Sequence, residues 1–163
     1  MNTDKLRIGV ISDTHVVELQ ELPASLLEAL KGVDMIVHLG DYTGKGLLNG
    51  LRNLGSFHGV SGNMDPLSVR VELPEREILD VGGKRIGLTH GSGSPWDLVA
   101  RVRKQFQDVD AILYGHSHLS CSEMIEGVLC LNPGSATGRF PAPGKTFGIL
   151  TVGDDIKGEI VAL

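Results

Sequence analysis

Seven side chains that commonly bind metal ions stand in five short blocks, each at the end of a strand-like apolar run. The blocks are Asp13-Thr14-His15, Gly40-Asp41, Gly62-Asn63, Thr89-His90-Gly91 and Gly115-His116-Ser117-His118. In α/β sheets, sites form at the carboxyl ends of strands, where loops project side chains into a shared crevice. We therefore expect two Asp, one Asn and four His side chains to converge on one rim. Each of them alone would fit a turn or a structural hydrogen bond, so it is their joint occurrence that indicates a site.

This set of ligands suits divalent metal ions. Carboxylate oxygen and imidazole nitrogen together bind borderline metals such as Mn, Fe, Co, Ni and Zn. The absence of cysteine from the blocks argues against a closed structural zinc site. Seven ligands exceed what one tetrahedral ion needs, but they fit two ions that share a carboxylate and clamp a phosphoryl group. The remaining two histidines, His38 and His58, lie within predicted strands, and we interpret both as structural.

Strands and helices alternate in the part of the chain that carries the blocks. Continuous apolar runs predict buried strands over 6–13, 34–41, 56–63 and 110–116. Helical spacing predicts helices over 22–30, 47–54 and 94–107. The first should begin near Pro23 and end before Gly32, and the third should have Ser94 as N-cap, Pro95 at its first position and Asp97 completing a capping pair.

The rest of the chain is predicted to form β-structure. Gly82-Gly83 predicts a hairpin between strands 77–81 and 84–89. Further strand pairs are expected at 119–125 with 128–131, and at 146–152 with 156–163. The whole pattern predicts one α/β domain over residues 1–163, folded as a four-layer αββα sandwich of two packed mixed sheets flanked by helices.

Composition narrows the function classes. The net charge of −5 argues against nucleic-acid binding by a basic surface, and the basic run at 101–106 has the spacing of a solvated helix face. No run approaches the roughly 18 apolar residues of a membrane span, and the polar start of the chain is unlike a signal peptide. Cys121 and Cys130 should face Asn132 and Glu123 across a hairpin, so we expect reduced, buried thiols in a cytoplasmic protein.

The order of the blocks, D-x-H, G-D, G-N-x-D, H-G and G-H-x-H, resembles the calcineurin-like metallophosphoesterase superfamily. They extend from Asp13 to His118, and the following Asn132-Pro133-Gly134-Ser135 is similar to the small single-domain bacterial and archaeal phosphodiesterase branch, which is related to the retromer scaffold subunit. We expect the latter segment to form a tight turn that supports the site from behind. The resemblance implies a metal-dependent phosphoesterase, more specifically a phosphodiesterase, in which a hydroxide bridging two metal ions attacks phosphorus in a small phosphate ester.

Carried over residue by residue, the resemblance assigns Asp13, His15 and His118 to the first metal. It assigns Asn63, His90 and His116 to the second metal, and Asp41 to the bridge between the two. Asp41 and Asn63 are thereby the expected catalytic residues, and Asn63 would also donate its amide N–H to a phosphate oxygen. Manganese is the expected ion, with Fe, Ni, Co or Zn as alternatives, because such ligands accept several metals.

Met64 departs from the pattern of many larger members, in which a His at this position protonates the leaving group. Such a general acid contributes about 10² to 10⁴ in rate, so we expect weak turnover of alkyl esters and better turnover of activated or aryl diesters. Asp65 either orients a metal-ligating His or is only a turn residue. Arg139 either binds the substrate phosphate or lies on the surface, and Trp96 either walls the cleft or packs.

Other functions fit the sequence less well. The stretch GDYTGKG at 40–46 is one residue short of a P-loop and lacks the Ser or Thr after its Lys. A scaffold or protein-interaction module on the same fold, with or without metal, is the main alternative, but we would expect eroded ligand positions there. Hydrolysis of a non-phosphate ester and the oligomeric state are left open.

Overall fold

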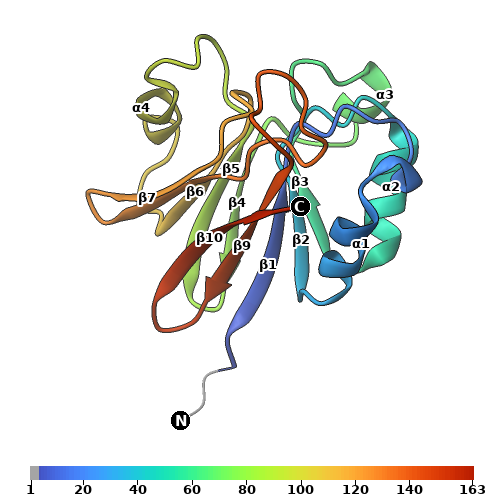
Figure 1. The fold of residues 1–163 in the computed structure, drawn as a ribbon. Helices are drawn as coiled ribbons and strands as arrows, with labels where there is room; N and C mark the ends of the chain where they lie inside the picture. Colours follow the sequence, from blue (N-terminus) through green and yellow to red (C-terminus); the bar gives the residue numbers. More distant parts are fainter. Residues whose placement is uncertain (1–3) are drawn as a thin grey trace.

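Two five-stranded mixed sheets form the centre of the molecule (Figure 1). The computed structural model describes residues 4–163, so the first three residues of the N-terminal segment discussed above lie outside it. The first sheet has the order β10-β9-β1-β2-β3. Its strands are β1 (Leu6–Ile11), β2 (Met35–His38), β3 (Phe57–Gly59), β9 (Thr146–Val152) and β10 (Ile156–Ala162).

The second sheet has the order β4-β5-β6-β8-β7. Its strands are β4 (Arg76–Val81), β5 (Lys84–Thr89), β6 (Ala111–Leu113), β7 (Cys121–Ile125) and β8 (Val128–Asn132). The helices are α1 (Ala24–Lys31), α2 (Lys45–Leu54), α3 (Leu67–Arg70) and α4 (Leu98–Arg103), with a 3-10 helix η1 at Leu19–Glu21.

Three apolar cores define four layers, which confirms the predicted αββα sandwich. One core lies between the sheets and joins Val10 of β1 to Leu88 and Leu113 of the second sheet. A second core packs α1 and α2 against the outer face of the first sheet, and a third packs α4 against the outer face of the second. In β1, Val10 belongs to the inner core and Ile11 to the outer one, because successive side chains point to opposite faces. Burial on both faces explains the continuous apolar run.

Parallel pairing brings the predicted strand ends together. β1, β2 and β3 are parallel to one another, as are β5, β6 and β8. Parallel neighbours end on the same side of a sheet, so the loops that follow them share one end of the sandwich. This is the upper end in Figure 1.

Several predicted elements are confirmed with small shifts at their ends. α1 has Pro23 as N-cap and Gly32 as C-cap. The β4–β5 hairpin turns at Gly82 and Gly83, with φ of 56° and 77°, and positive φ at both positions is what a two-residue hairpin turn with the twist of its strands requires. The register of β7 and β8 sets Cys121 opposite Asn132 and Cys130 opposite Glu123, and both cysteines are free. Only Cys130 is buried, since Cys121 is partly exposed.

The prediction of a helix over 94–107 is wrong at both ends. The helix α4 covers only Leu98–Arg103, and its N-cap is Asp97, which lies in the left-handed region at φ 57° and makes no capping bond. The guanidinium group of Arg101 explains the difference, because it donates to the carbonyl groups of Ser92, Ser94 and Trp96 and holds this stretch as a loop. Ser94 Oγ accepts only from Trp96 N, at 3.2 Å.

Two further expectations for this region change with the loop. Trp96 is 81% exposed and therefore does not pack against the protein. The basic run at 101–106 is not a fully solvated face, since Val102 and Phe106 are buried and Arg101 is half-buried. Within residues 4–163, no helix has both the length and the apolar character needed to cross a membrane.

Candidate metal centre

The loops after β1, β2, β3, β5 and β6 bring all seven predicted ligands to one end of the sandwich. His118 Nε2 lies 3.2 Å from Asp13 Oδ1, and His15 Nε2 lies 3.6 Å from Asp41 Oδ2. On the other side, His90 Nε2 is 3.4 Å from the same Asp41 oxygen. The remaining two, Asn63 and His116, contact each other through Asn63 Oδ1 and His116 Nδ1 at 3.3 Å.

Asp13, His15, Asp41 and His118 form a first group whose ligand atoms all lie within 4.8 Å of one another. Two of these atoms, Asp13 Oδ1 and His15 Nε2, are buried and have no hydrogen-bond partner among residues 4–163. Leaving a buried polar atom unsatisfied costs about 1–3 kcal/mol, and native proteins rarely do so without a functional reason. A cation coordinated by both atoms would remove this cost, so the group fits a metal ion.

Asn63, His90 and His116 form a second group on the other side of Asp41. His90 Nδ1 lies 2.7 Å from the Leu39 carbonyl oxygen, and His116 Nε2 lies 2.8 Å from that of Gly93. A carbonyl oxygen can only accept, so each of these nitrogens donates, and in the neutral imidazole the opposite ring nitrogen presents its lone pair to the centre.

The same reasoning applies to His118 in the first group. Its Nδ1 lies 3.0 Å from the carbonyl oxygens of Arg139 and Phe140, which leaves Nε2 to face Asp13. In the second group, His90 Nε2 lies 3.0 Å from Asn63 Oδ1. When His90 is neutral with its proton on Nδ1, both of these atoms are acceptors, and a cation between them would hold them together. The second group therefore also fits a metal ion.

Asp41 occupies the position between the two groups. Its Oδ1 accepts a hydrogen bond from Met64 N at 2.8 Å, which fixes the carboxylate and leaves Oδ2 facing both His15 and His90. Burial by itself would raise the pKa of the Asp41 carboxyl, but the contact with His90 and the bond from Met64 outweigh it and lower that pKa. The carboxylate is thus kept charged where two cations would share it.

The histidines respond to burial and charge in different ways. Burial opposes a charged imidazole at both His90 and His118, yet the neighbouring Asp41 and Asp13 carboxylates outweigh it, and the pKa of each histidine is raised. At His15, burial outweighs the attraction of Asp41 and Asp13, so its pKa is lowered. His15 therefore offers a neutral lone pair most readily.

Five of the seven predicted ligands have a left-handed backbone, which the sequence reasoning missed. They are Asp13 (φ 52°), His15 (φ 50°), Asp41 (φ 61°), His116 (φ 72°) and His118 (φ 62°). Such a conformation is uncommon for residues other than glycine, although Asp and His are enriched in it, and it persists only where the surroundings impose it. Hydrogen bonds between the loops do so here: Asp13 N donates to Gly40 O and His15 N to Asp41 O, both at 3.0 Å.

Two glycines allow the close approach of the loops. A Cβ atom at Gly62 would collide with the carboxylate of Asp41, and one at Gly115 would collide with the Ser12 hydroxyl. Only glycine, which has no Cβ atom, lets the backbone of these loops come so close to the ligand side chains.

Asp65 is buried and positions the site in a different way from the one predicted. Its carboxylate accepts from the backbone N–H groups of Gly62 at 2.7 Å, Asp41 at 3.0 Å and Thr43 at 3.0 Å. Of the two alternatives that the sequence left open for Asp65, a contact with a histidine ring and a turn residue, the bonds of its carboxylate to these three backbone groups favour the second. Asp65 thereby binds the loop after β2 to the loop after β3, and so holds Asp41 beside Asn63.

The Asn132–Ser135 turn supports the centre from behind, as predicted. Ser135 Oγ donates to the Asp13 carbonyl oxygen at 2.8 Å, and Asn132 Nδ2 donates to that of Gly115 at 3.0 Å. His38 is also structural: it is buried, accepts from Gly40 N through Nδ1 at 3.1 Å and contacts Thr14 Oγ1 through Nε2 at 2.9 Å. His58 contacts Glu77 at 3.0 Å, away from the centre.

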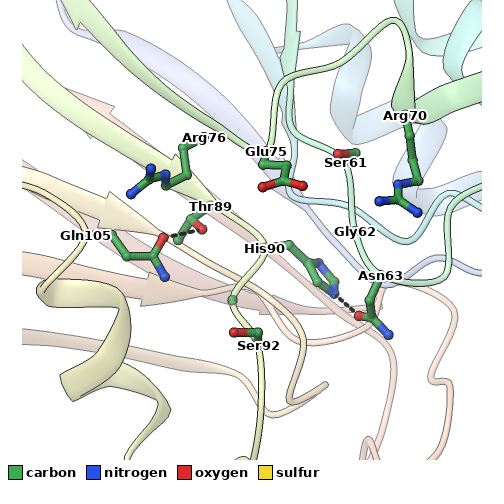
Figure 2. Close-up of a pocket in the computed structure, with 11 residues that line it drawn as sticks. Ser61, Gly62, Asn63, Arg70, Glu75, Arg76, Thr89, His90, Ser92 and Gln105 are labelled. Carbon is green, nitrogen blue, oxygen red and sulfur yellow. Dashed lines mark hydrogen bonds between the residues drawn. The ribbon is translucent and has the colours of Figure 1, made fainter.

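A polar pocket of about 500 Å³ opens beside the second group. Asn63 and His90 form one part of its wall, and Arg70, Glu75 and Arg76 form another (Figure 2). Trp96 is not among its lining residues. The sequence reasoning missed the two arginines, because they lie on α3 and β4 and carry no motif.

The comparisons with known proteins agree with this fold and site. The chain belongs to the calcineurin-like phosphoesterase superfamily, whose domain model matches residues 6–155, so the resemblance is confirmed. A probable metallophosphoesterase of Methanocaldococcus jannaschii is 36% identical over 163 residues, covering 96% of this chain and 81% of that protein.

Solved structures share the fold over nearly the whole chain. Zinc-complexed wild-type Vps29 from Entamoeba histolytica has a TM-score of 0.72 at 29% identity and covers 96% of this chain and 99% of its own. A structure described as a novel archaeal phosphodiesterase has a TM-score of 0.75 at 21% identity, covering 96% of this chain and 100% of its own. The latter likeness concerns the fold alone.

Proposed function

We propose that this chain is a phosphodiesterase whose active centre takes two divalent ions, with manganese as the preferred metal. The observation that carries the proposal is the pair of buried, unpaired ligand atoms Asp13 Oδ1 and His15 Nε2. Across Asp41, a second group of lone pairs converges on Asn63 Oδ1. Two groups of acceptors that share one carboxylate oxygen suit two cations better than one. The zinc-complexed Vps29 among the similar structures supports metal binding.

When bound, two divalent ions would polarise the phosphoryl oxygens and lower the pKa of water at the centre. The chain's own residues would hold and orient the substrate. Asn63 presents Oδ1 to the histidines, so its Nδ2 is directed elsewhere and can donate to a phosphate oxygen. Arg139 is exposed near the first group, and its charge reaches His15, where it adds to the effect of burial in lowering the pKa. We propose it as a further donor to the substrate phosphate.

Met64 shapes the substrate range. It is 59% exposed beside Asn63 and offers no proton to a leaving group. Esters with aryl or otherwise activated leaving groups need little protonation, and they should be hydrolysed faster than alkyl esters. We place the protein in the cytoplasm, where two free cysteines stay reduced.

The test is hydrolysis of bis(p-nitrophenyl) phosphate by protein stripped with a chelator and reloaded with Mn²⁺, Ni²⁺, Co²⁺ or Zn²⁺. We expect activity only with added metal, about two Mn²⁺ bound per chain by calorimetry, and loss of both properties in Asp41→Ala and His116→Ala. Asp154→Ala, a change in an exposed turn between β9 and β10, is the matched control and should keep both. Metal-loaded protein that hydrolyses no aryl phosphodiester would refute the proposal.

A scaffold function remains the second candidate, because Vps29 structures are among the similar ones. The presence of all seven ligand side chains in one centre places it second. Tight binding of a protein partner, unchanged in Asp41→Ala and without measurable hydrolysis, would make it the better description.

A further inference from the structure

The pocket beside the second group is lined almost entirely by hydrogen-bonding side chains and glycines. Among the residues that the structure describes, none with an aliphatic side chain and no Phe, Tyr or Trp lines its wall. Small-molecule pockets are usually lined mainly by apolar and aromatic groups, and an aryl group, a nucleobase or an acyl chain would bind through such contacts. Here such contacts are limited to the stems of polar side chains and to backbone carbon, while every side chain in the wall carries a hydrogen-bonding group, so the pocket suits a hydrophilic part of a substrate.

Two guanidinium groups give the pocket a positive character. Figure 2 shows Arg70 on the side of Asn63, Arg76 on the side of Gln105, and the carboxylate of Glu75 between them. Figure 2 marks no hydrogen bond between either guanidinium group and the other residues drawn around the pocket. Arg52 and Arg103, by contrast, are paired with Glu72 and Glu126. Arg70 and Arg76 therefore keep their donors available to a ligand.

The backbone around Arg70 is anchored to the core. Val69, the preceding residue, is fully buried, and Glu72 forms ion pairs with Lys45 and Arg52 of α2, both at 2.5 Å. These contacts tie the segment just after α3 to α2, and with buried Val69 they set the base from which Arg70 extends toward the pocket.

Arg76 and Gln105 are positioned through Thr89. Arg76 is paired with Thr89 across β4 and β5, and Thr89 Oγ1 donates to Gln105 Oε1 at 2.8 Å. Because this bond occupies the amide oxygen, Gln105 turns its Nε2 donor to the pocket (Figure 2). The far side of the pocket thus combines a guanidinium group with an amide donor, and Glu75 adds one acceptor.

We propose that this pocket binds the part of the substrate beyond the reacting phosphate, and that this part is a polyol carrying a second anionic group, a phosphate or a carboxylate. Arg70, Arg76 and Gln105 donate to that anion, and Glu75 accepts from a hydroxyl. A volume of about 500 Å³ lies within the range of pockets for small metabolites. The inference rests on the proposed phosphodiesterase function and names its substrate class.

The first experiment compares two diesters, p-nitrophenyl glyceryl phosphate and the same compound phosphorylated on the glycerol. The measured quantity is the ratio of kcat/KM for the phosphorylated to the unphosphorylated diester. A charge-assisted hydrogen bond contributes about tenfold, so with two guanidinium contacts we expect a ratio of about 100. Arg70→Ala and Arg76→Ala should each lower the ratio about tenfold, and Arg70→Lys should lower it less. Arg7→Ala removes the same charge at the opposite end of β1, where Arg7 is exposed, and should leave the ratio unchanged.

The ratio separates two roles for Arg70. If Arg70→Ala lowers kcat/KM equally for both diesters, Arg70 binds the reacting phosphate, and the inference is overturned. A wild-type ratio near one, or equal effects of Arg70→Ala and Arg7→Ala, would overturn it as well.

The second experiment needs neither metal nor turnover. Metal-free ¹⁵N-labelled protein is titrated with glycerol bisphosphate, and the side-chain Nε–Hε signals of arginine are followed by NMR. Signals of Arg70 and Arg76 should shift while that of Arg7 stays in place. If the protein hydrolyses no ester but these signals shift, the proposed function fails and the anion site stands. Hydrolysis of simple diesters without any shift would overturn the anion site alone.

Discussion

Replacing Asp65 with asparagine should destabilise the metal centre and the fold together. The Asp65 carboxylate accepts three backbone N–H groups, two on Oδ2 (Gly62 and Asp41) and one on Oδ1 (Thr43). An amide has one accepting oxygen, so whichever way it turns, its NH₂ faces at least one of these donors. Losing the acceptor of one buried N–H costs about 1–3 kcal/mol, and losing the charge on the other two bonds costs about 1 kcal/mol each. With Asp65 only 5% exposed, we expect Asp65→Asn to lower the free energy of unfolding by about 3–5 kcal/mol.

The assay is urea unfolding of metal-free protein, followed by circular dichroism, with calorimetric titration of Mn²⁺ into the folded variant. Because Asp65 joins the loops of Asp41 and Asn63, the Mn²⁺ affinity should fall about 10- to 100-fold, as it does when groups that hold metal ligands are removed. Asp154→Asn makes the same chemical change in an exposed turn and should alter neither quantity. A loss of less than about 1 kcal/mol in Asp65→Asn, or an unchanged Mn²⁺ affinity, would refute the reasoning.

Three further predictions concern single side chains. Met64→His should raise the rate of alkyl phosphodiester hydrolysis by about 10²-fold. The control Met124→His changes a methionine of similar exposure on β7 (57% against 59% for Met64) and should not raise this rate. Equal rates in the two variants would contradict the role given to Met64. Burial lowers the pKa of His38 well below its usual 6.5, so below pH 6.5 the unfolded chain takes up a proton that the folded protein refuses, and stability falls as the pH falls. Below pH 6.5, the unfolding free energy of the wild type should fall by about 1.4 kcal/mol per pH unit more than that of His38→Gln. If the unfolding free energies of the two proteins instead changed with pH in parallel, His38 would be charged in the folded protein. Burial raises the pKa of the Cys130 thiol to about 11. At pH 8, Cys130 should therefore react slowly with a thiol reagent in the folded protein and completely in protein unfolded by urea. Fast labelling of Cys130 in the folded protein, detected by mass spectrometry, would count against this prediction.

Local pattern was sufficient for much of the fold. The buried strands, α1 with its Pro23 and Gly32 ends and the Gly82-Gly83 hairpin were all predictable, because periodicity and turn chemistry act between neighbouring residues. The helix at 94–107 failed because a tertiary contact overrode its capping signal: Arg101 reaches back to the carbonyl groups of Ser92 and Ser94. The short helix α3 carried too little periodicity to be found, and Arg70 was missed with it.

The sequence by itself determined which side chains form the centre. Each predicted ligand follows an apolar run, and the ends of parallel strands meet at one edge of a sheet, so the five blocks in order were enough to predict that these side chains converge and to predict the family. The tertiary structure alone decided how these side chains act. His116 N donates to Asp13 Oδ2 across 103 positions of the chain, and the Leu39 and Gly93 carbonyl groups select the ring nitrogens that face the centre. Asp65 binds three backbone N–H groups, a role that neither of its two sequence-based alternatives specified. Such choices depend on the register and packing of segments far apart in the chain, and no local pattern records them.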